Sequence, residues 1–118
     1  MNEIIQEQNE NTRDIIFKNI TDIRALCVKH FVKNLFVFGS ILTEYFDKQS
    51  DVDFLYEIDV NKLNKAEGKT DYVDNLFQFE DALSAILKRK IDLLPNIYIH
   101  NKYMRENINR NKRLLYAA

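Results

Sequence analysis

The sequence predicts an α/β fold, of the α+β kind, in which helices cover a small sheet of three or four strands. Short apolar runs near residues 34–38, 52–57 and 90–95 have the length and composition of strands. Longer segments at residues 12–30 and 70–90 carry apolar side chains at helical spacing. Because helical and extended segments alternate along the chain, a layered arrangement of sheet and helices is expected.

The first helix is predicted over residues 12–30, with Thr12 as its N-cap. Apolar residues recur along it every three or four positions and form one stripe: Ile16, Ile20, Ile23 and Cys27. Cys27 is the only cysteine, so an intramolecular disulfide is excluded and a buried packing role is expected. Residues 1–11 are polar and are expected to be a frayed leader.

The first strand is predicted to end at Gly39, and a short helix is predicted over residues 40–47. A glycine directly after a strand allows a tight turn and lets a ligand approach the backbone without a Cβ in the way. Ser40 can cap the following helix, whose first amide groups together with the Ser40 hydroxyl would form a phosphate site. An ordinary strand-to-helix turn is the alternative.

The second strand is predicted to open on two acids, Asp51 and Asp53. Side chains alternate across a strand, so these carboxylates point to one face while Val52 and Phe54 point to the other. Two neighbouring carboxylates repel unless a divalent cation joins them, and hard oxygen ligands favour Mg²⁺ or Mn²⁺. The alternative is a solvated strand entry, in which Ser50 and Asp51 serve turn chemistry.

The next segments read as a loop and a helix. Residues 59–70 are polar and predict a mobile loop, after which Thr70 can cap a long helix that reaches the basic residues 88–90. Five apolar residues keep helical spacing along it: Tyr72, Leu76, Phe79, Leu83 and Ile86. Its aromatic side chains, Phe77 included, are predicted to be core rather than a base-stacking surface.

A third acid lies in the third predicted strand, residues 90–95, which alternates around Asp92 and ends at the only proline, Pro95. Ile91 and Leu93 would enter the core, and Asp92 would face the side of the other two acids if the strands pair in a suitable register. An outward-facing strand residue is the alternative. Three acids beside a phosphate turn favour two-metal phosphoryl or nucleotidyl transfer. A shorter helix near residues 101–111 and an extended tail at 112–116 complete the domain.

Residues 38–55 (FGSILTEYFDKQSDVDFL), followed by residues 91–94 (IDLL), resemble the DNA polymerase β superfamily of nucleotidyltransferases. More narrowly, the chain is similar to the minimal nucleotidyltransferases of prokaryotes. The resemblance implies a mixed sheet whose active face is open to nucleotide. It also implies site roles for five residues: phosphate binding by Gly39 and Ser40, and binding of two Mg²⁺ ions by Asp51, Asp53 and Asp92.

The resemblance further implies that Asp92 helps to activate the attacking hydroxyl. One departure from the family pattern concerns phosphate binding. Many relatives carry an arginine shortly after the Gly-Ser pair, whereas Ile41 and Leu42 follow it here. The triphosphate charge would then be met by Lys48, by a partner or by metal alone.

The function implied by the resemblance is Mg²⁺-dependent transfer of a nucleoside monophosphate, AMP from ATP, to a hydroxyl acceptor. The expected acceptor is a tyrosine of a partner HEPN-type ribonuclease toxin, which the chain would silence as an antitoxin. Two alternatives stay open: an antibiotic nucleotidyltransferase, and a non-catalytic module that keeps the fold and binds a partner. A homo-oligomer is also left open.

Composition limits the remaining choices. The 118 residues, 46% of them hydrophobic, suffice for a single domain over residues 1–118. Residues 1–87 hold 9 Lys/Arg and 16 Asp/Glu, a net of −7, whereas residues 88–118 hold 8 and 2, a net of +6. Because the total is balanced, no general polyanion-binding surface is implied and nucleic acid is not expected as a direct ligand. The charge of the basic end is either satisfied internally or by solvent, or it contacts an acidic partner, a nucleotide or RNA. The polar N-terminus and the absence of a long apolar stretch predict a soluble cytoplasmic protein without membrane contact.

Overall fold

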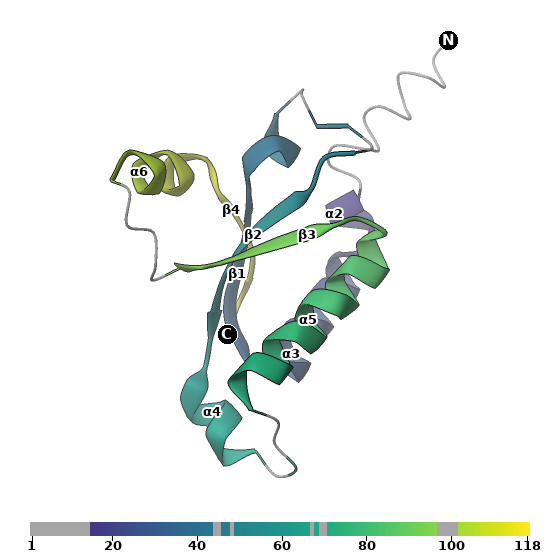
Figure 1. Ribbon diagram of the computed structural model, residues 1–118, viewed down its shortest axis with the longest axis vertical. Helices are drawn as coiled ribbons and strands as arrows, with labels where there is room; N and C mark the ends of the chain where they lie inside the picture. Colours follow the sequence, from purple (N-terminus) through teal and green to yellow (C-terminus); the bar gives the residue numbers. More distant parts are fainter. Residues whose placement is uncertain (1–14, 44–45, 48, 67, 69–70, 97–101) are drawn as a thin grey trace.

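A mixed sheet with strand order β3-β2-β1-β4 forms the centre of the molecule (Figure 1). The computed structural model describes residues 15–43, 46–47, 49–66, 68, 71–96 and 102–118. In this part of the chain, β1 (Val32–Phe38) pairs antiparallel with both β2 (Val52–Ile58) and β4 (Arg113–Ala117). β2 pairs parallel with β3 (Ile91–Pro95). The predicted α/β class and the mixed sheet are therefore confirmed.

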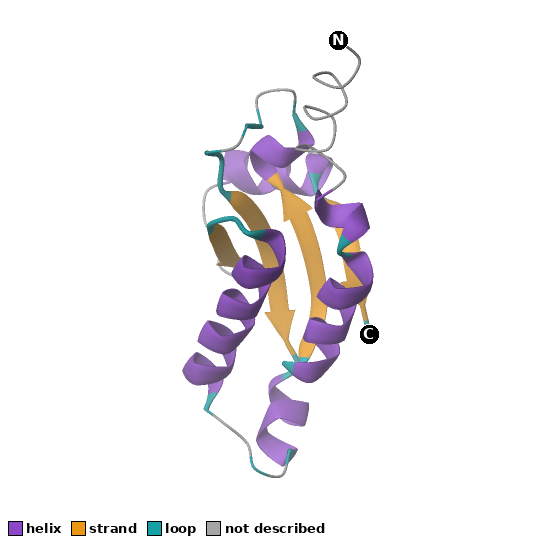
Figure 2. Ribbon diagram, turned by 90° about the vertical axis from the view of Figure 1, so that its right-hand side faces the viewer, coloured by secondary structure: helices purple, strands orange, loops and turns teal. Residues whose placement is uncertain are grey.

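The two faces of the sheet are covered by different helices. Figure 1 shows α3 (Ile20–Lys29) and α5 (Tyr72–Leu87) on one side of the sheet and α6 (Lys102–Asn111) on the other. Figure 2 looks onto the α3 and α5 side. The main core lies between this side and the sheet, and its fully buried members are Ile23, Cys27, Leu35, Val52, Phe54, Leu63, Phe79 and Leu83. A smaller cluster joins Ile108 of α6 to Leu55 on the opposite face.

The predicted helix over residues 12–30 is divided into α2 (Ile15–Lys18) and α3. The division falls at Asn19, whose Nδ2 donates to the carbonyl oxygen of Ile15 at 2.7 Å. The predicted stripe is confirmed, since Ile16, Ile23 and Cys27 are all buried. Burial raises the pKa of the Cys27 thiol to about 12, which suits a packing residue rather than a nucleophile. The leader over residues 1–11 and the Thr12 cap lie outside the described residues.

The long helix α5 begins with a capping aspartate. The side chain of Asp71 accepts a hydrogen bond from the Asp74 amide at 2.9 Å, while the predicted cap Thr70 lies outside the described residues. Phe79 is fully buried as predicted, but the prediction that the aromatic side chains are core is wrong for Tyr72 and Phe77, which are 39% and 59% exposed. Lys88 ends the helix in a left-handed conformation.

The predicted loop over residues 59–70 contains a helix, α4 (Val60–Lys65). Asp59 caps it by accepting a hydrogen bond from the Lys62 amide, and Leu63 is buried against the main core. The prediction failed because a single buried leucine among asparagine and lysine residues leaves almost no apolar periodicity.

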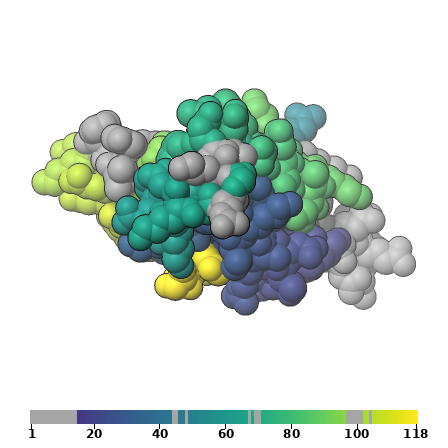
Figure 3. Space-filling view, turned by 90° about the horizontal axis from the view of Figure 1, so that it is seen from below, coloured from purple at the N-terminus to yellow at the C-terminus, as the bar shows by residue number. Residues whose placement is uncertain are grey.

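The predicted helix near residues 101–111 and the extended tail are confirmed as α6 and β4. The tail is a full edge strand of the sheet, and Figure 3 shows its yellow C-terminal end beside the blue N-terminal half of the chain. Within the described ranges, no helix has the length and apolar character needed to cross a membrane.

Candidate functional site

The strand register brings two of the predicted acids together. Asp53 on β2 and Asp92 on β3 are direct partners across the parallel pair. Their neighbours Val52 and Ile91 belong to the main core, so alternation along each strand places both acids on the opposite face, which α6 covers. β2 and β3 therefore pair in the register that brings Asp92 to the side of Asp53, as predicted. Asp51 lies one residue before the start of β2.

The electrostatics of this face centre on Asp53. Burial, followed by the charges of Asp92 and Asp51, raises the pKa of the Asp53 carboxyl to about 6. Asp53 is half-buried, whereas Asp92 is exposed. Within the described part of the chain, none of the three carboxylates accepts a hydrogen bond or forms an ion pair with the protein. The acids therefore form a negative cluster to which the described residues supply no counter-charge.

The polar residues just before β2 form a hydrogen-bonded turn. Asp47 Oδ1 accepts from the Gln49 amide at 2.8 Å and from Ser50 Oγ at 3.1 Å, and these bonds lower the pKa of the Asp47 carboxyl. Ser50 thus serves turn chemistry, as the alternative interpretation of the strand entry proposed. Asp51 takes no part in these bonds and stays available for a ligand.

Arg89, just beyond the end of α5, secures this turn. Its Nη1 donates to the carbonyl oxygens of Asp47 and Ser50, the latter at 3.1 Å, and its guanidinium lies 4.7 Å from the centre of the Phe46 ring. No local pattern predicts this role, because Arg89 lies 42 and 39 positions from the residues it contacts and a basic residue at a helix end has an ordinary explanation.

We expect Arg89→Ala to lower nucleotidyl transfer by about tenfold, because the turn that precedes Asp51 loses its anchor and the acid becomes less well positioned. Arg89→Lys should have a transfer rate close to that of Arg89→Ala, since an ammonium group cannot reproduce the contact with two carbonyl oxygens and the stacking on Phe46. Steady-state transfer rates would measure the effect. Lys90→Ala is the matched control, because it removes the same charge from an exposed neighbouring side chain. Equal losses in both variants would contradict a positioning role for Arg89.

The Gly39 turn lies directly against the acids. Gly39 has φ +82°, and a Cβ at this position would collide with Oδ2 of Asp53. Glycine is therefore required here both by conformation and by the close approach of the carboxylate. The predicted tight turn is present, but the group that approaches Gly39 in the structure is the Asp53 carboxylate, and approach by a ligand stays a prediction.

The helix predicted over residues 40–47 is wrong. The chain forms only a single turn of 3₁₀-helix, η2 (Gly39–Leu42), and then returns to an extended conformation at Thr43. Ser40 makes no side-chain cap; instead its carbonyl oxygen accepts from the amide and the hydroxyl of Thr43. Ile41 is buried in the main core, which explains an apolar residue after the Gly-Ser pair. Phosphate binding by Gly39 and Ser40 stays a prediction.

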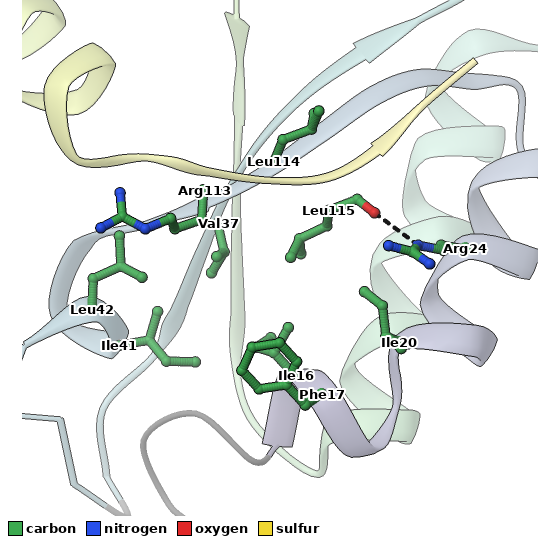
Figure 4. Close-up of a pocket in the computed structure, with 10 residues that line it drawn as sticks. All are labelled: Ile16, Phe17, Ile20, Arg24, Val37, Ile41, Leu42, Arg113, Leu114 and Leu115. Atoms are coloured by element: carbon green, nitrogen blue, oxygen red, sulfur yellow. Dashed lines mark hydrogen bonds between the residues drawn. The ribbon is translucent and has the colours of Figure 1, made fainter.

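A cavity of about 450 Å³ adjoins the Gly39 turn. Phe38, Gly39 and Leu42 line one side, and Asn107, Asn111 and Arg113 are among the residues that line the other. A second, slightly larger cavity of about 490 Å³ lies between α2, η2 and β4, and its lining is mostly apolar (Figure 4). None of the three acids lines either cavity, but Gly39, which lines the first, lies against the carboxylate of Asp53, so the first cavity adjoins the acids.

His30 has a structural explanation. It is buried at the end of α3, where its ring Nδ1 lies 3.3 Å from Oδ1 of Asn75 and its carbonyl oxygen accepts from Nδ2 of the same residue. Burial lowers the pKa of the His30 imidazole. A neutral histidine fixed in the core by one asparagine is a packing residue, remote from the acidic face.

The suitability of the acids for a metal ion follows from their donor chemistry. Asp51, Asp53 and Asp92 offer only hard oxygen donors, which suit Mg²⁺ or Mn²⁺, and each lacks a cationic partner in the described part of the chain. In the present side-chain arrangement, no three His, Cys, Asp or Glu residues among those described are grouped closely enough to hold one ion. A bound cation would have to draw these carboxylates together.

Comparison with known proteins agrees with the geometry. Residues 20–115 match the family model for the nucleotidyltransferase domain, whereas no curated protein matches the chain. Among solved structures, a minimal nucleotidyltransferase is similar with a TM-score of 0.63 and 21% identity, over 85% of this chain and 92% of that one.

Two toxin-antitoxin structures also share the fold. A toxin-antitoxin crystal structure with AMP-PNP aligns with a TM-score of 0.59 and 15% identity, over 85% of this chain and 74% of that one. The complex of a tri-AMPylated HEPN toxin with an MNT antitoxin from Shewanella oneidensis aligns with a TM-score of 0.52 and 14% identity, over 85% and 71% of the two chains. At these identities the likeness concerns the fold.

Proposed function

Because the chain belongs to the nucleotidyltransferase domain family, we propose that it transfers AMP from ATP to a hydroxyl group of a partner protein. The observation that carries this proposal is the pairing of Asp53 with Asp92 beside the Gly39 turn. These features lie on one face of the sheet, adjacent to a cavity of about 450 Å³. They supply the acidic half and the phosphate half of a nucleotide site.

The residues have distinct parts in the proposed reaction. The acceptor oxygen attacks the α-phosphorus, the new O–P bond forms, and the bond from this phosphorus to the bridging oxygen breaks to release pyrophosphate. Asp92, which is exposed, accepts the proton of the incoming hydroxyl. Gly39 and Ser40 would hold the phosphates, while the space left by the missing Cβ of Gly39 is taken by Oδ2 of Asp53.

Asp51, Asp53 and Asp92 are the residues that would hold Mg²⁺. When bound, two ions would neutralise charge that develops on the attacking and leaving oxygens. The raised pKa of Asp53 fits this role, since a carboxylate crowded by two others gains most from a cation.

A tyrosine of a HEPN-type toxin is the acceptor we propose. Support comes from the solved complex of similar fold in which such a toxin is tri-AMPylated and bound to its antitoxin. The chain would then act as an antitoxin that modifies its partner.

A second candidate function is a non-catalytic module that binds a partner through the same fold. One observation favours it: Ile41 is buried and Leu42 is apolar, so η2 itself offers no cation to the triphosphate. The retention of three mutually repelling acids favours the enzyme instead, because an idle cluster of this kind destabilises the fold.

The decisive experiment incubates the chain with ATP, Mg²⁺ and the protein encoded beside it, and measures the intact mass of that protein. We expect mass increments of one or more AMP units, which should disappear in EDTA and with Asp92→Asn. A transfer assay on aminoglycosides serves as the comparison. Binding of the partner without any added mass would favour the non-catalytic module, and modification of the drug alone would favour an antibiotic nucleotidyltransferase.

A further inference from the structure

The cavity beside the Gly39 turn has a polar wall supplied by the C-terminal part of the chain. Asn107 and Asn111 of α6 line it, and Nδ2 of Asn111 donates to Oδ1 of Asn107 at 2.6 Å. Phe38 lines the opposite side and is the β1 partner of Asp53, so this cavity adjoins the acidic face. Its lining combines these polar groups with apolar side chains such as Leu42 and Ile108, so it can take a ligand that has both polar and apolar parts.

Arg113 is the only charged residue among those described that line this cavity. It stands at the start of β4, opposite Val37 of β1, and is exposed. Arg113 also lines the mostly apolar cavity drawn in Figure 4, where its side chain extends toward Leu42, a residue that both cavities share, and away from Leu115. A residue distant in sequence from Gly39 is therefore brought to the same cavity by the antiparallel pairing of β4 with β1.

The guanidinium of Arg113 is held in place on one side only. Its Nη1 donates to the carbonyl oxygens of Asn111 at 3.0 Å and Lys112 at 3.4 Å, at the end of α6. No carboxylate in the described part of the chain forms an ion pair with it. The remaining N–H donors are thus available to an anion, and the carbonyl contacts limit the motion of the side chain.

Charge balance indicates what that anion is. A nucleoside triphosphate placed at Gly39 would lie near three carboxylates, and the turn η2 itself offers no cation to its outer phosphates. An arginine fork is well suited to phosphate oxygens. We propose that Arg113 binds the phosphates of the nucleoside triphosphate that are released as pyrophosphate. This inference rests on the proposed function and adds a residue to its site.

Calorimetry with an ATP analogue in which a methylene group joins the α- and β-phosphorus atoms would test the proposal in the presence of Mg²⁺. We expect Arg113→Ala to weaken binding by about tenfold, the usual effect of removing a charge-assisted hydrogen bond. Mg²⁺-tripolyphosphate, which has no base or sugar, should compete with the analogue, and its affinity should fall by a similar factor. The affinity of Arg113→Lys for both ligands should lie between that of the wild type and that of the alanine variant.

Arg110→Ala is the matched control, because it removes the same charge from the last turn of α6 at an exposed residue that does not line the cavity. Arg113→Gln keeps the length of the side chain and replaces the alanine variant if that variant is poorly folded in a thermal melt. Unchanged affinity in the Arg113 variants, with normal binding by the wild type, would overturn the role of Arg113 and leave the proposed function intact. A wild type that binds neither ligand with Mg²⁺ would instead contradict the proposed function, and this inference with it.

Discussion

Replacing Asp53 with asparagine should abolish nucleotidyl transfer, by at least about a thousandfold, while making the fold more stable. The loss is expected because Asp53 lies between the Gly39 turn and Asp92 and would be shared by both metal ions. The gain is expected because the raised pKa of Asp53 shows that the fold disfavours its charged form. Asparagine keeps the volume of the side chain and removes that charge.

The stability gain has a defined pH dependence. The pKa of Asp53 rises from 3.8 to about 6 on folding, so between these values the native state binds more protons than the unfolded state. The free energy of unfolding contributed by this group therefore falls as pH rises through about 6. Above that pH, Asp53→Asn should gain about 1 kcal/mol, a value reduced for the partial exposure of the carboxylate. Near pH 4 the gain should vanish.

Thermal melts of both proteins in EDTA, at pH 7.5 and pH 4, would measure this difference. His30 titrates in the opposite sense, since its lowered pKa makes the fold less stable as pH falls, but it is present in both proteins and cancels in their difference. Adding Mg²⁺ should raise the melting temperature of the wild type more than that of the variant. A variant that melts below the wild type at pH 7.5 would assign Asp53 a structural role.

The sequence was informative where one local pattern determined one outcome. Gly39 after an apolar run predicted a tight turn, and the alternation of acids with apolar residues predicted that Asp53 faces away from Val52 and Phe54. The pairing of Asp53 with Asp92 was only conditional, because register depends on how two distant strands pair. The sequence shows which register would bring the two acids together, but it does not show that the strands adopt this register.

Other features depend on tertiary contacts that leave no local trace. Arg89 reaches the carbonyl of Ser50 across 39 positions, and Arg113 reaches the Gly39 cavity only because β4 pairs with β1. The helix predicted after Gly39 failed for a related reason, since burial of Ile41 against the core fixes a single 3₁₀ turn where the amino-acid types alone permit a longer helix. Tertiary packing overrides propensity at each of these places.

Gly39→Ala should lower both the free energy of unfolding and the rate of transfer, because the new side chain would strain the backbone and also collide with a neighbouring carboxylate. Alanine at φ +82° is strained, and its Cβ would collide with Oδ2 of Asp53. The collision can be relieved only if the carboxylate moves, and a misplaced acid is expected to reduce transfer by about a hundredfold. We expect a total destabilisation of about 2–3 kcal/mol, measured by denaturant unfolding.

Gly68→Ala separates these costs, because Gly68 also has a positive φ, of 64°, but a Cβ there would meet nothing within 4 Å. That variant should lose only about 1 kcal/mol, the cost of backbone strain. In an Asp53→Ala background, the effect of Gly39→Ala should fall to a similar value, since the colliding carboxylate is gone. If Gly39→Ala costs the same with and without that carboxylate, the contact between the turn and Asp53 does not determine the need for glycine. A reduced cost would establish that the Gly39 turn and Asp53 are energetically coupled, as expected if both belong to the proposed nucleotide site.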